Sequence, residues 1–164
     1  MQYQYIEHED NDLELKSFLL KNDLCMQKEY EWGYKVFDSN QLVACGFVQG
    51  HLLMMVAISK EYRHQGILQK LMLKLFETCM QKNIDPIYLF TKREHISSFK
   101  ACGLFTIIDD EVSMMSNDKN ILDKQNIKEY LVQEKWPYSY YFCKNTKEYK
   151  EYKNKIQEKL KYGN

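Results

Sequence analysis

The chain has 164 residues, a length that suits one domain with a real core and leaves no room for a second catalytic domain. Its 23 basic and 23 acidic residues give a formal net charge of zero, which disfavours nucleic acid and anionic membrane surfaces as partners. No apolar run approaches the roughly 20 residues that cross a bilayer, and the polar residues 1–5 do not resemble a signal peptide, so a cytoplasmic protein without membrane contact is expected.

The first third of the chain predicts strands around one helix. Residues 3–7 alternate like a short strand, and residues 10–24 carry apolar side chains at helical spacing after an acidic cap. Residues 34–38 and 41–48 are rich in β-forming residues, and the Ser-Asn pair between them favours a hairpin.

The next segment predicts a parallel β-α-β unit. Residues 52–59 are continuously apolar, which is typical of a strand that helices cover on both faces. The apolar positions that follow recur at steps of three and four, as on one buried helical face: Leu68, Leu71, Met72, Leu75, Phe76 and Cys79. Residues 83–86 break this helix, and residues 87–91 read as a strand that returns parallel to the first.

The remainder of the chain predicts further helices and one strand. Residues 94–102 have helical spacing and stop at Gly103, and residues 104–108 read as a strand. From residue 113 the chain is expected to form a helical C-terminal extension that packs on the same domain. The expected fold is therefore an α/β (α+β) domain, residues 1–112, with a mixed, mostly antiparallel sheet flanked by helices, followed by a helical tail, residues 113–164.

The junction between the apolar strand and its helix is a candidate anion site. The first backbone N–H groups of a helix have no partner within the helix and attract phosphate oxygens. Gly66 has no Cβ, so a bulky anion can approach the backbone, and Arg63 can add a charge-assisted contact. A pyrophosphate turn is the hypothesis, and a glycine-capped surface turn is its alternative.

The neighbouring residues add a family resemblance. The run Tyr-Arg-His-Gln-Gly-Ile at residues 62–67, after a Val-Ala-Ile strand, resembles motif A of the GNAT acyl-CoA N-acyltransferase superfamily, which binds the pyrophosphate of coenzyme A. The resemblance implies a GNAT-like fold and acetyl-CoA as acyl donor. It implies these cofactor-binding residues: Val56, Ala57, Ile58, Arg63, His64, Gln65, Gly66, Ile67 and Leu68.

A second resemblance covers about residues 1–112. The runs Leu-Val-Ala-Cys-Gly at 42–46, Leu-Phe-Thr-Lys-Arg-Glu-His-Ile at 89–96 and Phe-Lys-Ala-Cys-Gly-Leu at 99–104 look like the N-terminal, GNAT-like domain of citrate lyase ligase. In that family an ATP-using nucleotidyltransferase domain follows and loads acetate onto the thiol of a coenzyme A-like prosthetic group. Its nucleotide-binding strand and His-x-x-His-type signature do not follow in this sequence.

Three positions bear on catalysis. Leu68 stands where the motif usually has Gly or Ala, so its side chain either crowds the turn or faces the core. Phe99 stands where many GNAT enzymes carry a tyrosine that protonates the leaving thiolate, and phenylalanine cannot donate a proton. His95 is the candidate catalytic residue, because an imidazole relays protons near neutral pH, and a surface or capping role is its alternative.

The five cysteines stand at wide spacings without a Cys-x-x-Cys pair or a Cys/His cluster, so no metal site is predicted. Each is expected to be a small buried hydrophobe, with a catalytic thiol at Cys45 or Cys102 as the alternative.

Three functions are compatible with these features. The first is an acetyl-CoA-dependent N-acetyltransferase that acts on an unidentified small-molecule or peptide amine, with residues 8–36 and the tail shaping the acceptor pocket. The second is a non-catalytic binding module for acyl-CoA or a coenzyme A-like prosthetic group, related to citrate lyase ligase. The third is an oligomerisation scaffold. Each of the three functions is compatible with a homodimer.

Overall fold

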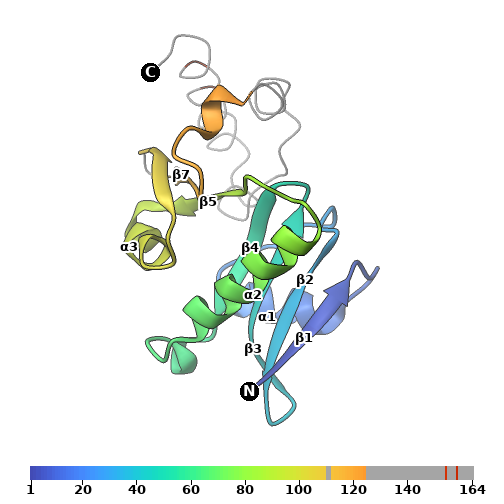
Figure 1. Ribbon diagram of the computed structural model, residues 1–164. Helices are drawn as coiled ribbons and strands as arrows, with labels where there is room; N and C mark the ends of the chain where they lie inside the picture. Colours follow the sequence, from blue (N-terminus) through green and yellow to red (C-terminus); the bar gives the residue numbers. More distant parts are fainter. Residues whose placement is uncertain (110–111, 125–153, 155–157, 159–164) are drawn as a thin grey trace.

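A computed structural model describes residues 1–109, 112–124, 154 and 158 (Figure 1). The strands are β1 (Gln2–Glu7), β2 (Trp32–Asp38), β3 (Gln41–Gln49), β4 (Leu52–Ile58), β5 (Tyr88–Lys92), β6 (Phe105–Ile108) and β7 (Val112–Ser116). They form a seven-stranded sheet in the order β1-β2-β3-β4-β5-β7-β6. Neighbouring strands pair antiparallel except β4 and β5, which are parallel, so the expected mixed, mostly antiparallel sheet is confirmed.

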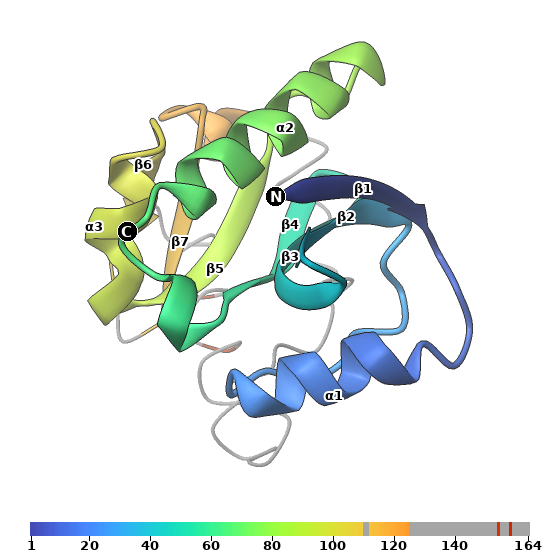
Figure 2. The same cartoon turned by 90° about the horizontal axis from the view of Figure 1, so that it is seen from below.

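Two helices cover opposite faces of this sheet, as Figure 2 shows. Within residues 1–109 and 112–124 the helices are α1 (Leu13–Lys21), α2 (Ile67–Gln81) and α3 (Ile96–Lys100), with short 3-10 turns at Lys60–Tyr62, Arg93–His95 and Ile121–Asp123. The two that cover the faces are α1 and α2 (Figure 2). Leu71 and Leu75 of α2 are fully buried in the core on one face, and Leu15 and Leu19 of α1 are fully buried in the core on the other. Full burial of one such side chain contributes about 1.5–3 kcal/mol, so each helix is held by its apolar face.

A buried ion pair fixes the start of α1 on the sheet. The backbone N–H of Leu15 donates to Asp12 Oδ1 at 3.1 Å, which caps the helix. Lys35 Nζ of β2 lies 2.7 Å from Asp12 Oδ2 and 3.2 Å from Glu14 Oε1, and the Lys35 and Asp12 side chains are only 7% and 5% exposed. Burial disfavours the charged ammonium, but its bonds to Asp12 and then Glu14 outweigh burial and raise the pKa of Lys35.

Strand β7 is an element that the sequence did not predict. It lies between β5 and β6, and Met114 and Met115 are fully buried there together with Ser113 and Ser116. A run of Val-Ser-Met-Met-Ser lacks the alternation that identifies a strand, which explains the omission. Of the tail predicted to be helical, residues 113–116 belong to this strand, residues 121–123 form a 3-10 turn, and nearly all the rest lies outside the described residues.

The cysteines follow the expectation in part. Cys45 and Cys79 are buried free thiols, and Cys102 is a half-buried free thiol. Cys25 is disulfide-bonded, so the interpretation of every cysteine as a small buried hydrophobe is wrong for this residue. In the part of the chain that the structure describes, no helix is both long and apolar enough to cross a membrane.

Candidate functional site

The parallel strands β4 and β5 enclose a cavity where they diverge. They pair only at Leu52 and Tyr88, and beyond that pair β5 runs away from β4 (Figure 1). A cavity of about 880 Å³ opens there, lined by every residue of β4 and by residues 89–92 of β5. This volume is large enough for a cofactor arm together with a small acceptor.

A β-bulge shapes the β4 side of the cavity. Phe47 pairs with Met54 and Cys45 pairs with Ala57, so two residues of β4, Met55 and Val56, stand opposite a single residue of β3. Met55 has a φ of 53°, a left-handed conformation that is strained for a residue with a side chain. A bulge leaves one residue outside the ladder, so it changes the direction of β4 beside the cavity.

The turn between β4 and α2 has the form of an anion cradle. His64 and Gly66 adopt left-handed φ values of 64° and 80°, and a Cβ on Gly66 would meet nothing within 4 Å. The first helical bond runs from Lys70 N to Gly66 O at 3.2 Å, so the N–H groups of the first turn of α2 have no partner within the helix. These groups and the helix dipole favour a negative group at this spot.

Side chains of the turn fold back onto its own backbone. Arg63 Nε donates to Ile58 O at 3.1 Å, and Gln65 Nε2 donates to Glu61 O at 3.0 Å. The hydroxyl of Tyr62 reaches outside the turn and donates to Asp38 Oδ2 at 2.7 Å, and this bond raises the pKa of Tyr62. The turn is therefore preorganised, and Tyr62 ties it to the β2–β3 hairpin.

If the turn holds coenzyme A, as the motif resemblance implies, Tyr62→Phe should weaken its binding about 3- to 10-fold, because the loss of one hydrogen bond of about 0.5–1.5 kcal/mol loosens the turn. Asp38→Asn keeps an oxygen that accepts from Tyr62, so its affinity should stay near that of the parent protein. Isothermal titration with coenzyme A measures both. Equal affinities for the parent protein and Tyr62→Phe would show that the turn holds its shape without this bond.

Most of the cofactor-binding residues expected from the sequence line this one cavity. They are Val56, Ala57, Ile58, Arg63, His64, Gly66, Ile67 and Leu68. Gln65 does not line the cavity, since its amide points back to Glu61. The half-buried Leu68 lines the cavity and also packs against the core.

The β5 side of the cavity holds the candidate catalytic residue. His95 is 46% exposed on its side chain, its Nε2 lies 3.6 Å from Glu94 Oε1, and both residues line the cavity. Phe99 is buried and also lines it. Thr91 of β5, a buried polar residue in the wall, was missed by the sequence analysis, although a lone threonine in an apolar run is a weak signal for it.

Neither thiol weighed as a nucleophile suits that role. Cys45 is fully buried, does not line the cavity, and burial raises the pKa of its thiol far above neutrality. Burial also raises the pKa of Cys102, whose Sγ donates to Ser98 O. Both thiols therefore stay protonated near neutral pH and are poor nucleophiles.

The opposite wall comes from the loop after α1. Asn22, Asp23, Leu24 and Gln27 line the cavity from this loop. They fall within residues 8–36, the segment expected to shape the acceptor pocket.

Among the residues that the structure describes, no group of three or more His, Cys, Asp and Glu side chains is placed to hold a metal ion.

Comparison with known sequences identifies similar proteins. A sequence model described as the acetyltransferase (GNAT) family matches residues 3–105. The chain is 30% identical over 131 residues to a citrate (pro-3S)-lyase ligase of Haemophilus influenzae. The matched region covers 76% of this chain and 38% of that protein. The chain is also 30% identical over 94 residues to the corresponding ligase of Escherichia coli, covering 57% of this chain and 27% of that one. The chain thus spans well under half the length of these relatives.

Comparison with solved structures gives the same fold. Escherichia coli ElaA superposes with a TM-score of 0.59 at 17% identity, over 72% of this chain and 100% of that one. A GNAT-family acetyltransferase of Staphylococcus aureus superposes with a TM-score of 0.57 at 19% identity, over 72% and 99% of the two chains. A Bacillus subtilis acetyltransferase, solved in complex with CoA, superposes with a TM-score of 0.52 at 13% identity, over 71% and 99%.

Proposed function

Since this chain belongs to the acetyltransferase (GNAT) family, we propose that it transfers the acetyl group of acetyl-CoA to an amine. The observation that supports this most is the turn at residues 59–66. Its left-handed Gly66 and the free N–H groups of α2 line the same cavity as the diverging strands β4 and β5. An anion cradle beside a slot between strands suits a long ligand with a pyrophosphate at one end and a thioester at the other.

We assign the binding roles by position along the cavity. The backbone at His64, Gly66 and the first turn of α2 would hold the pyrophosphate, and Arg63 would flank it. Val56, Ala57 and Ile58 would hold the pantetheine arm through the backbone groups of β4 next to the bulge. A backbone N–H directed at the thioester carbonyl would stabilise the oxyanion that develops there.

The chemistry requires one bond to form and one to break. The amine nitrogen attacks the thioester carbonyl carbon, the new C–N bond forms, and the C–S bond then breaks with release of the coenzyme A thiolate. His95, whose imidazole lies beside Glu94 at the rim, would accept the proton that the amine loses. Phe99 has no proton to give, so the thiolate would be protonated from solvent.

The first experiment is titration of the protein with acetyl-CoA in a calorimeter, followed by measurement of free thiol in the presence of a panel of amines. The proposal expects micromolar binding and thiol release that depends on one class of amine. A protein that binds neither acetyl-CoA nor CoA contradicts it.

We expect His95→Gln to lower kcat about 100-fold or more, which is the range for loss of a positioned general base. The KM for acetyl-CoA should stay nearly unchanged, because His95 lies at the β5 rim and not in the phosphate turn. Steady-state kinetics with the active amine measures both constants. Glu94→Gln is the matched control, since it keeps the imidazole and removes only its exposed partner. An unchanged kcat for His95→Gln would show that His95 is not the general base and that solvent takes the proton of the amine.

A second candidate function is a non-catalytic module that binds acyl-CoA or a coenzyme A-like prosthetic group. Phe99 in the cavity wall and the similarity to citrate (pro-3S)-lyase ligases favour it. This candidate expects binding without amine-dependent thiol release, and tighter binding of dephospho-CoA than of CoA. The calorimetric comparison of these two ligands therefore separates the module from the acetyltransferase.

A further inference from the structure

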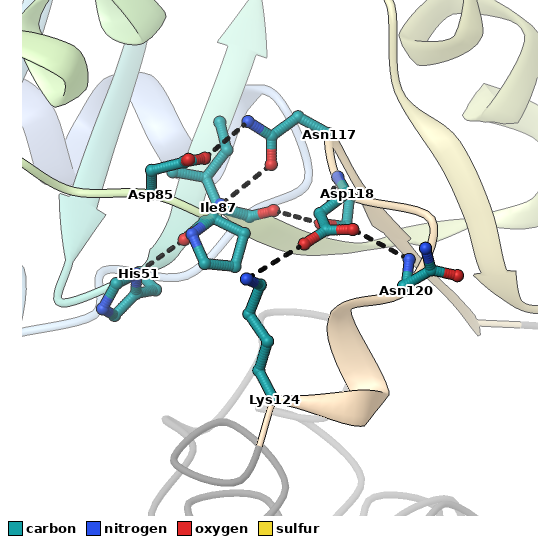
Figure 3. A network of polar contacts seen from close by, with 9 residues as sticks. His51, Asp85, Ile87, Asn117, Asp118, Asn120 and Lys124 are labelled. Carbon is teal, nitrogen blue, oxygen red and sulfur yellow. Dashed lines mark hydrogen bonds and ion pairs between the residues drawn. The ribbon is translucent and has the colours of Figure 1, made fainter.

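The strands β4 and β5 form a wedge, which is closed where they pair at Leu52 and Tyr88 and open at the cavity. A network of polar contacts lies at the closed end of this β4–β5 wedge (Figure 3). Tyr88 N donates to His51 O at 2.9 Å beside the single pair of the parallel ladder. Strand β5 is otherwise held by β7, through five successive residue pairs from Tyr88 with Ser116 to Lys92 with Val112. The strands β5, β7 and β6 therefore form a unit that joins β4 at one narrow point.

At that point side chains bind the backbone just before β5. The N–H of Ile87 donates to Asn117 Oδ1 at 3.0 Å, and the Ser116 hydroxyl donates to Ile87 O. The ring nitrogen His51 Nδ1, on the β4 side, donates to Pro86 O at 2.6 Å. Ile87 is only 1% exposed, so its peptide groups need these protein partners in place of water.

Further hydrogen bonds hold Ser116 and Asn117 in position. Asn117 Nδ2 donates to Asp85 Oδ1 at 3.3 Å, so the Asn117 amide binds the chain on both sides of Pro86. Asp118 N donates to Ser116 Oγ at 3.1 Å, and the Asp118 carboxylate accepts from Asn120 N at 2.9 Å. These contacts fix where β5 starts relative to β4 and β7.

We propose that the side-chain clamp of His51, Ser116 and Asn117 sets the opening of the β4–β5 wedge and so positions both walls of the acyl-CoA slot. The inference rests on the proposed function for its ligand. A strand that joins its parallel neighbour at one residue pair can pivot there, and its direction then depends on what holds its start. The clamp residues do not line the cavity, so they act on the ligand only through the strands.

The central test compares Asn117→Ala with the control Thr78→Ala. Asn117→Ala leaves the Ile87 N–H without its acceptor and should weaken coenzyme A binding about 5- to 10-fold, the factor for one lost hydrogen bond. Thr78→Ala removes the 2.7 Å contact between Thr78 Oγ1 and the Tyr34 hydroxyl, away from the cavity, and should lower the melting temperature without changing affinity. Equal affinities for the two variants overturn the proposal.

A rescue variant separates positioning from general damage. In the double variant Asp85→Asn with Asn117→Asp, the two side chains exchange roles, and an oxygen at position 117 still accepts from the Ile87 N–H. The affinity of this double variant for coenzyme A should equal that of the parent protein and exceed that of Asn117→Ala. An affinity as low as that of Asn117→Ala counts against the clamp. If Asn117→Ala does not fold, Ser116→Ala takes its place, because it removes the donor to Ile87 O.

A measurement without ligand makes the test independent of the proposed function. Amide hydrogen exchange of the free protein should be faster at residues 56–58 and 90–92 in Asn117→Ala than in Thr78→Ala, since a looser wedge exposes these strand segments. If the parent protein binds no coenzyme A, the proposed function fails, and this comparison still decides on the clamp. Identical exchange in both variants overturns it.

Discussion

Gly66→Asp should reduce coenzyme A affinity by roughly 100-fold or more while the protein stays folded. A carboxylate at this position would stand where the first N–H groups of α2 meet the phosphates, and would repel them. Each charge-assisted hydrogen bond lost there corresponds to about 1.5–3 kcal/mol. The left-handed φ of 80° adds local strain, but a new Cβ meets no atom within 4 Å, so the fold should survive. Isothermal titration measures the affinity, and circular dichroism checks the fold.

Gly103→Asp is the matched control for this substitution. Gly103 also has a left-handed φ, of 93°, and open space around its absent Cβ, but it lies in the turn after α3 and does not line the cavity. The two variants therefore share the same backbone strain and the same added charge. If both lose coenzyme A binding equally, or if neither does, the phosphate turn is misplaced.

Asp12→Ala should lower the free energy of unfolding by about 3 kcal/mol, the low end of the cost of breaking a buried ion pair, because Glu14 stays beside Lys35. The Lys35 ammonium, 7% exposed on its side chain, would keep only Glu14 as partner. The cap of α1 would be lost as well. Urea denaturation followed by circular dichroism measures this change.

Two further variants identify the source of the loss. Asp12→Asn keeps the capping oxygen and removes the charge, so the difference between Asn and Ala at this position reports the cap alone. The double variant Asp12→Ala with Lys35→Met removes both charges and should recover much of the loss. If Asp12→Ala costs less than about 1 kcal/mol, the range of an exposed pair, the pair is not buried in solution.

The same pair has a defined pH dependence. The pKa of Lys35 is raised in the folded protein, and its usual value is 10.5. Its contribution to stability is therefore complete below pH 10.5 and disappears as the pH rises through the folded-state pKa. The Asp12→Ala protein lacks most of this contribution, so the difference in stability between it and the parent should narrow in strong alkali to the part that the cap of α1 supplies.

The strand, turn and helix around Gly66 were predictable because their signals are local. The apolar run of β4 and the three-four periodicity of α2 depend on neighbouring residues, and both elements lie where the sequence placed them. The parallel pairing of β4 with β5 followed from the crossover through α2.

Other features of the site depend on contacts that no local pattern encodes. The bulge at Met55 arises from the register between β3 and β4, which a single strand sequence does not specify. Tyr62 binds Asp38, 24 positions earlier in the chain. The clamp binds Ile87 to Ser116 and Asn117, about 30 positions later. The sequence predicted the position of the turn at Gly66, its binding of phosphate stays a prediction, and the structure adds the side-chain partners that hold the turn.

The burial of Cys45 and Cys79 has a practical consequence for the assay of this protein. Cys45 is 0% exposed and Cys79 is 2% exposed. Cys45 Sγ also donates to Met55 O at 3.2 Å inside the bulge. Cysteine thiolates attack colourimetric disulfide reagents only when the reagent can reach them, so these two cysteines do not react while the chain is folded. Cys102 is a half-buried free thiol, so its reaction sets the baseline that is subtracted before a thiol signal during turnover is read as released coenzyme A. A further slow rise in the absence of amine would signal unfolding that exposes Cys45 and Cys79.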